Sequence, residues 1–149
     1  MSETNTSQEL IEALRLVVAD TYALMGQTHL CHWNVRGPSF FALHAAFEEQ
    51  YNELFAAVDE LAERVRAIGS LAPGGLSKLS EMAGIPEIKE DATAEEMVSH
   101  LSEANAKVVK DLAKVRDLAG EGDPQTEDLA IARIQVHEKF IWMLNSYLA

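Results

Sequence analysis

Residues 31–44 read CHWNVRGPSFFALH, and this stretch joins two patterns of helical spacing. Before it, apolar and small side chains recur every three or four positions, the spacing of one helix face: Leu10, Leu14, Val17, Thr21, Leu24, Thr28, Cys31 and Val35. Gly37-Pro38 interrupts the pattern because proline cannot continue a helix. Apolar residues at the same three- and four-residue spacing resume at Phe40 and continue to Ile68, just before Gly69. The stretch therefore predicts a turn between two long helices.

Residues 70–92 are predicted to connect the second helix to the third. They are rich in glycine and proline, and the segment is long enough to cross one end of a bundle. Leu76, Leu79 and Met82 lie at helical spacing within it, which indicates one short helix.

Two further helices follow, and each has a recognisable start. Thr93 and Glu96 form a T-x-x-E capping box, in which each side chain bonds the other residue's backbone N–H. Asp123-Pro124 combines a good helix-capping side chain with a proline in the first turn. Four amphipathic helices with one long middle connection are typical of an all-α four-helix bundle.

The length and composition fit one globular domain. Of the 149 residues, 48% are hydrophobic and 24% are charged, so residues 1–149 are expected to form a single domain with residues 1–8 as a flexible tail. No apolar run approaches the ~20 residues that cross a bilayer, and no secretion signal begins the chain. We therefore expect a cytoplasmic protein without a membrane partner. The single cysteine, Cys31, and Trp142 are expected to pack in the core.

The charge balance argues against a polyanionic partner. Acidic residues number 24 against 12 basic ones, for a net charge of −12. Binding a DNA backbone requires Lys and Arg to displace counterions, and these are in the minority. Excess carboxylate suits hard cations, although it more commonly forms a solvated acidic surface.

The second predicted helix carries a stripe of ionisable side chains away from its apolar face. Measured from His44 at 100° per residue, Glu48 lies at about 40° and Asp59 at about 60°. Glu63 follows at about 100°, whereas the apolar residues cluster near about 300°. Phe55, at about 20°, falls inside the polar stripe and is expected to be partly exposed in a single chain. A polar stripe that contains an aromatic side chain is typical of a contact surface.

This helix is too long for its ionisable residues to meet within one chain. His44 and Asp59 are 15 residues apart, or about 22 Å along the axis. Two copies running antiparallel would instead place the His44 end of one helix opposite the Asp59 end of the other, at two equivalent sites. His32 would join His44 after the turn at Gly37-Pro38. Two imidazoles with two or three carboxylates are a ligand set that suits Fe(II).

The same residues also fit simpler roles than metal binding. Carboxylates four residues apart on a helix are usually solvated, and a histidine on an apolar helix is more often packed or hydrogen-bonded than a metal ligand. Asp59 and Glu63 are also placed to pair with Arg64 or Arg66. A di-iron site inside one bundle is not expected, because the E-x-x-H pattern of such sites is absent from the chain.

The stretch from His32 onward resembles the Dps family, the mini-ferritins of bacteria and archaea. That family shows H-W-N-x-x-G-x-x-F-x-x-x-H, then an acid four residues later, then D-x-x-A-E-R. This chain matches the pattern without a gap at 32–44, Glu48 and 59–64. Residues 137–144 also look like the family's last helix, so the resemblance covers essentially the whole chain.

The resemblance implies a ferritin-like four-helix bundle that forms twofold dimers and hollow shells of twelve subunits. Such proteins oxidise Fe(II), usually with hydrogen peroxide, at ferroxidase centres between subunits, and they store ferric iron inside, which protects against oxidative damage. Carried over to this chain, the iron ligands are His32, His44 and Glu48 from one subunit with Asp59 and Glu63 from its partner. The catalytic set is His32, His44, Asp59 and Glu63. Glu48 departs from the aspartate that the family often has at its position.

Two other functions fit parts of the sequence. Some relatives compact DNA with tails rich in Lys and Arg. Residues 1–9 contain neither, and the chain ends at Tyr147-Leu148-Ala149, so DNA binding is not expected. The second alternative is a metal-free helical scaffold, whose acidic stripe only makes contacts between subunits.

Overall fold

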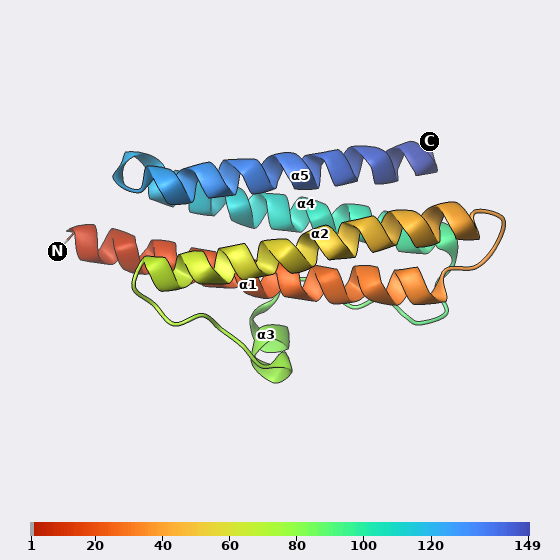
Figure 1. Cartoon of the computed structure of the whole chain (residues 1–149), viewed down its shortest axis with the longest axis horizontal. Coiled ribbons are helices and arrows are strands. Elements are labelled where there is room, and N and C mark those ends of the chain that lie inside the picture. Colours follow the sequence, from red (N-terminus) through yellow and green to blue (C-terminus); the bar gives the residue numbers. More distant parts are fainter. Residues whose placement is uncertain (1) are drawn as a thin grey trace.

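The computed structural model describes the backbone of residues 2–149 and the side chains from residue 8 onward. This part of the chain forms four long helices and one short one (Figure 1). They are α1 (Ser2–Asn34), α2 (Phe40–Ala67), the short α3 (Leu76–Met82), α4 (Ala94–Ala119) and α5 (Pro124–Leu148), with a 3-10 turn, η1 (Gly120–Gly122), between α4 and α5. The predicted all-α four-helix bundle, with a short helix in its long connection, is confirmed.

The flexible tail expected over residues 1–8 stays a prediction. Met1 and the side chains of residues 2–7 lie outside the part of the chain that the structure describes. The backbone from Ser2 onward belongs to α1. Across the described residues, no helix is both long and apolar enough to span a membrane.

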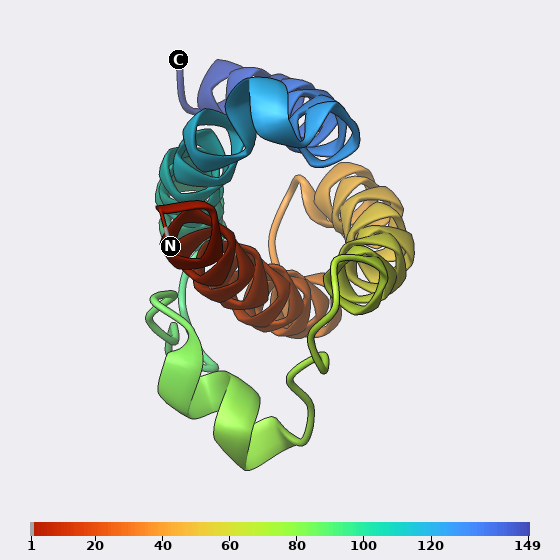
Figure 2. The same ribbon diagram turned by 90° about the vertical axis from the view of Figure 1, so that its left-hand side faces the viewer.

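The long helices form two antiparallel pairs. Helix α1 packs against α2, α4 packs against α5, and α1 also contacts α4. Viewed from one end, the four long helices surround a common axis, while α3 lies outside the bundle beside α1 (Figure 2). Two arginine–carboxylate pairs join α2 to α5: Arg133 with Glu53, and Arg64 with Asp123. The long connection therefore covers a flank of α1, and ion pairs bridge α2 and α5.

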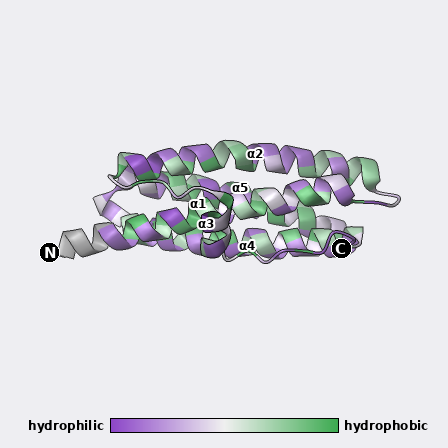
Figure 3. Cartoon of the chain, turned by 90° about the horizontal axis from the view of Figure 1, so that it is seen from below, coloured by the Kyte–Doolittle hydropathy of each residue, from purple (hydrophilic) through white to green (hydrophobic). Residues whose placement is uncertain are grey.

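Apolar side chains fill the space between the helices. On α2 they recur at the predicted spacing, and the buried ones are Leu43, Phe47, Leu54, Leu61 and Val65. Hydrophobic and hydrophilic residues alternate along each long helix in Figure 3, as expected of amphipathic helices. Cys31 is fully buried, as predicted, and burial raises the pKa of its thiol to about 12. Removing this apolar surface from water is the main stabilising contribution to the fold.

The expectation that Trp142 lies in the core is wrong. Its side chain is 65% exposed. The face of α5 that points into the bundle carries His137 and Leu144, both buried. Trp142 lies five positions after His137, or about 140° around the helix, so it points away from the bundle.

The predicted helix ends are formed by local hydrogen bonds. The Thr93 hydroxyl accepts from the Glu96 N–H at 3.1 Å, and the Glu96 carboxylate accepts from the Thr93 N–H at 2.9 Å. The Asp123 carboxylate accepts from the Thr126 N–H at 3.1 Å at the start of α5. Between α1 and α2 the chain turns at Gly37, whose φ of +107° is a conformation that side chains with a Cβ rarely adopt.

The capping box at the start of α4 leads to a stability prediction. Thr93→Ala should lower the free energy of unfolding by about 1 kcal/mol, because the Glu96 N–H loses its acceptor. Thr93→Ser keeps the hydroxyl and is the matched control. Urea denaturation at one fixed subunit concentration measures the difference. Equal stability of the two variants would contradict a stabilising role for this cap.

Candidate metal centre

The turn between α1 and α2 brings two of the predicted ligands into direct contact. His32 lies near the end of α1 and His44 lies in the second turn of α2. Their rings stack with centroids 3.8 Å apart and an angle of 14° between the planes. His32 Nδ1 bonds the His44 carbonyl at 2.8 Å, and His44 Nδ1 bonds the His32 carbonyl at 2.7 Å. The two residues therefore hold each other's rings in place.

These reciprocal bonds determine which ring nitrogen is free. A carbonyl oxygen can only accept, so each Nδ1 must carry a hydrogen and donate it. In the neutral ring this leaves the lone pair on Nε2, and both Nε2 atoms are available as metal ligands. A second bond that orients the ring and selects its tautomer is typical of histidines that bind metals.

Glu48 adds a carboxylate beside the histidine pair. It lies one helical turn after His44 on α2, and its Oε1 is 3.8 Å from His32 Nε2. The carboxylate side chain is 54% exposed, so it can move. His32, His44 and Glu48 thus lie near one another, but within the described part of the chain they do not converge closely enough to hold a metal ion.

Asp59 and Glu63 do not join this group within one chain. Both are exposed on the later turns of α2. Neither arginine that was a candidate partner pairs with them. Arg64 donates to Asp123 and Thr126, and Arg66 donates to the Ser70 carbonyl. Among the residues that the structure describes, no three His, Cys, Asp or Glu side chains are placed to hold a metal ion. The five predicted ligands fall into two separate groups.

Aromatic side chains surround the histidine pair. The exposed Trp33 packs against His29 in a tilted arrangement, with 3.8 Å between ring centroids and 32° between the planes, and His29 packs against Tyr51 at 4.4 Å and 30°. Tyr51 in turn meets the His32 ring edge-on at 5.1 Å. The sequence interpretation missed His29 and Tyr51, although His29 lies one helical turn before both His32 and Trp33. Burial and the neighbouring His32 lower the pKa of His29.

Two large aromatic side chains next to these groups are open to solvent. Trp33 is 63% exposed and Phe55 is 67% exposed, so the predicted exposure of Phe55 is confirmed. Exposed aromatic side chains among polar groups are typical of a protein interface.

The centre of the bundle holds a buried polar network with a different chemistry. His137 is fully buried, its Nδ1 lies 2.7 Å from Asn105 Oδ1, and Arg133 donates to its Nε2 at 3.2 Å. Arg133 also forms a bidentate pair with Glu53. Burial and the charge of Arg133 lower the pKa of His137 to about 3, so the ring is neutral. Both ring nitrogens are occupied by protein partners, so His137 is a structural residue rather than a metal ligand.

Comparisons with known proteins bear on the fold and the family of the chain. The family description "Ferritin-like domain" matches residues 11–149. DNA protection during starvation protein 2 of Bacillus anthracis is 36% identical over 143 residues, which are 95% of this chain and 98% of that protein. The crystal structure of a Dps protein from Bacillus brevis shares 38% identity with a TM-score of 0.93, covering 97% of this chain and 98% of its own. Dps from Thermosynechococcus elongatus, at 27% identity, has a TM-score of 0.96 over 100% and 96% of the two chains.

The bundle and the family match together define a ferritin-like protein. Within that class, the chain belongs to the Dps family, because relatives more than 30% identical cover nearly its whole length. The resemblance that residues 32–64 indicate is thereby confirmed.

Proposed function

We propose that this Dps-family protein is a ferroxidase that binds Fe(II) between two subunits, oxidises it with hydrogen peroxide and stores the ferric product in a hollow homo-oligomeric cage of twelve subunits. The observation that carries the proposal is the histidine pair, whose Nε2 atoms are free while each Nδ1 is held by a carbonyl. Such rings are oriented for metal binding before any metal arrives.

The chemistry of the donors fits iron. Neutral imidazole nitrogen holds Fe(II), and carboxylate oxygen stabilises the higher charge of Fe(III). The chain supplies His32, His44 and Glu48 near the start of α2, while Asp59 lies exposed about 22 Å from His44 along the axis and Glu63 lies exposed one turn beyond it. A second chain running antiparallel completes the set, with each subunit giving one half of each centre.

The protein side chains have distinct tasks in this reaction. Two Fe(II) ions supply the two electrons that reduce one peroxide to two waters, with uptake of two protons. His32 and His44 position the metal ions, and the carboxylates balance the added positive charge. Trp33 and Phe55, once covered by the partner, exclude bulk water from the centre, which strengthens the attraction between the carboxylates and iron.

A direct iron-oxidation assay tests the proposal. Anaerobic protein is mixed with Fe(II), hydrogen peroxide is added, and ferric absorbance is followed, after which gel filtration separates bound from free iron. We expect oxidation faster than in buffer, about two Fe(II) consumed per peroxide, and ferric iron eluting with the protein. Iron that elutes only in the small-molecule fractions would favour the metal-free scaffold instead.

DNA binding is the main alternative, since similar proteins carry the name "DNA protection during starvation protein". The net charge of −12 opposes it, because acidic residues outnumber basic ones by 24 to 12. We propose a cytoplasmic protein that detoxifies iron and peroxide without binding DNA. A retarded protein–DNA complex in a gel-shift at low salt would contradict the proposed absence of DNA binding.

A further inference from the structure

A continuous column of aromatic rings joins α1 to α2. Each ring contacts the next, with 3.8–5.1 Å between neighbouring centroids. In order, the rings of this ring column belong to Phe40, His44, His32, Tyr51, His29 and Trp33. They come from both helices. The candidate ligands His32 and His44 therefore lie inside a packed series of rings.

Tyr51, on α2, contacts two histidine rings of α1 at once. Its ring centroid lies 4.4 Å from that of His29 and 5.1 Å from that of His32, whereas the two histidine rings are 6.3 Å apart. Tyr51 meets the His32 ring edge-on, and His32 also stacks on His44. Together with the bond from Nδ1 to a carbonyl, these two contacts limit the rotation of the His32 ring.

His29 is held by packing rather than by hydrogen bonds. His32 and His44 are each tied to a carbonyl through Nδ1. Within the described part of the chain, no hydrogen-bond partner acts on the half-buried His29 ring. The ring instead packs against both Trp33 and Tyr51. The contribution of His29 to this region is therefore the space that its ring fills.

We propose that His29 is a positioning residue for the candidate metal centre. Its ring supports Tyr51, Tyr51 holds His32, and His32 thereby keeps its Nε2 in the direction in which it binds iron. The role needs a flat ring of this size and no nitrogen. The inference rests on the proposed function, because His32 is a candidate iron ligand only there. It adds a residue that is not one of the five candidate ligands but supports one of them.

The size of the effect follows from the contacts that His29 makes. Replacing it with alanine removes two ring contacts, one to Trp33 and one to Tyr51. A close aromatic pair shifts an equilibrium by about two- to tenfold beyond the effect of the area that it buries. Without His29, Tyr51 keeps only its contact with His32 among the rings of the column. Both rings should then leave their positions more often.

Chemical modification of the metal-free protein tests this role without iron. Diethyl pyrocarbonate acylates an unprotonated imidazole nitrogen that it can reach, and mass spectrometry locates the product on each histidine. The assembled protein is treated at one pH, and the rate at His32 is compared with the rate at His100 on α4. His32 should react about two- to tenfold faster in His29→Ala than in the wild type, because its ring is less firmly held. The rate at His100 should not change.

His29→Phe is the matched variant, because phenylalanine supplies a flat ring without a nitrogen. In this variant His32 should react at the wild-type rate. All rates are measured on the gel-filtration fraction that has the wild-type assembly state. A wild-type rate at His32 in His29→Ala would overturn the proposal, since the ring would then have no effect on His32. A rate in His29→Phe as fast as in His29→Ala would overturn it as well.

Binding of Co(II), followed by its visible absorbance, extends the test to the candidate metal centre. A His32→Ala variant identifies the part of the signal that depends on this ligand. His29→Ala should weaken that binding about tenfold, as expected for a residue that supports a ligand, and His29→Phe should match the wild type. Equal weakening in both variants would show that a nitrogen of His29 is needed and would overturn the proposal. If the wild type gives no signal that depends on His32, the proposed function fails, while the modification rates still decide the role of His29.

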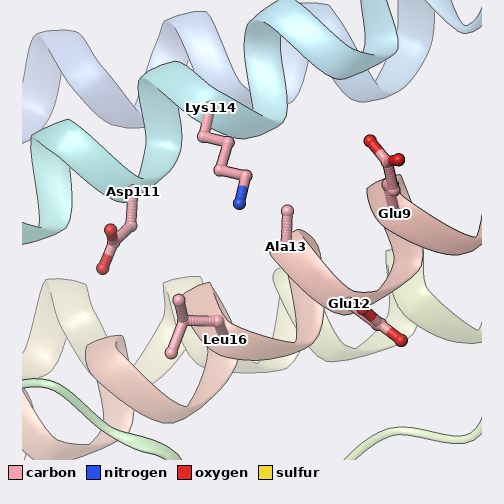
Figure 4. A pocket seen from close by; sticks show the side chains of 6 residues that line it. All are labelled: Glu9, Glu12, Ala13, Leu16, Asp111 and Lys114. Carbon is pink, nitrogen blue, oxygen red and sulfur yellow. The ribbon is translucent and has the colours of Figure 1, made fainter. Parts of the chain in front are cut away.

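A control for Co(II) bound elsewhere is available on the same helix. A pocket between α1 and α4 has four charged lining residues: Glu9, Glu12, Asp111 and Lys114 (Figure 4). Glu12 lies 17 residues before His29, or about 26 Å along α1. Glu9→Gln with Glu12→Gln should therefore leave the binding that depends on His32 unchanged. A loss as large as that in His29→Ala would show that charge far from the ring column controls the site, and it would contradict the proposal.

Discussion

Two inactive variants of this protein should restore each other's activity when they are combined in one dimer. The first, His32→Ala with His44→Ala, lacks the imidazole half of the proposed centre. The second, Asp59→Asn with Glu63→Gln, lacks the carboxylate half but keeps the volume of both side chains. Each variant alone should oxidise iron at least roughly 10–100-fold more slowly than the wild type. A loss of that size follows removal of a residue that only supports a metal ligand, and these variants remove the ligands themselves.

Mixing recovers activity because each centre draws on two chains. In a mixed dimer one centre contains neither half and the other contains both. Random pairing of equal amounts makes half of the dimers mixed, so about a quarter of the wild-type activity should return in the unfractionated mixture. Mixed dimers purified through two different affinity tags have one intact centre of two, so their initial rate of Fe(II) oxidation by peroxide should be about half that of wild-type dimers.

The control combines two differently tagged copies of the histidine variant, which should stay inactive. Verified mixed dimers that also stay inactive would show that the two halves do not meet between chains. Activity in the carboxylate variant alone would show that Asp59 and Glu63 are not ligands.

Glu53→Gln should destabilise the bundle more than a double variant that replaces both members of the Glu53–Arg133 ion pair. The Arg133 side chain is 5% exposed and depends on Glu53, whose side chain is 35% exposed. Without the carboxylate, a buried guanidinium loses its counter-charge, which costs about 3–5 kcal/mol for a fully buried pair. Because Glu53 is partly solvated, we expect a loss of about 2–3 kcal/mol in the free energy of unfolding.

The matched control is the double variant Glu53→Gln with Arg133→Gln. It removes both charges together and keeps an amide N–H that can donate to His137, so no buried charge is left without a partner and its stability should lie closer to the wild type than that of Glu53→Gln alone. Chemical denaturation at one subunit concentration compares the variants, since oligomer stability depends on concentration. Equal stabilities for the single and double variants would show that Arg133 does not need its carboxylate.

Local sequence signals predicted the helices well because they act over a few residues. Gly37-Pro38 ends one helix pattern, the Thr93–Glu96 box starts another, and the structure has helix ends at both places. The rise of a helix also predicted that His44 and Asp59 cannot meet within a chain, and among the described residues they do not. These predictions need only backbone geometry and near neighbours.

The residues that the sequence interpretation missed depend on helix packing. Trp142 looks like a core residue by composition, but its position around α5 turns it outward. The Glu53–Arg133 pair joins residues 80 positions apart, and no local pattern indicates it. Such contacts follow from the rotation and register of one helix against another.

The amino-acid sequence was enough to predict the bundle, the separation of the candidate ligands into two groups, and the resemblance to the Dps family. Helix packing, in contrast, decides how the candidate ligands are oriented and where the connection between α3 and α4 is attached to α1. The reciprocal bonds of His32 and His44 depend on how α2 returns along α1. The Asp20–Gly84 bond joins residues 64 positions apart. Periodicity identifies which face of a helix is apolar, but only packing decides which polar atoms of distant segments meet across that face.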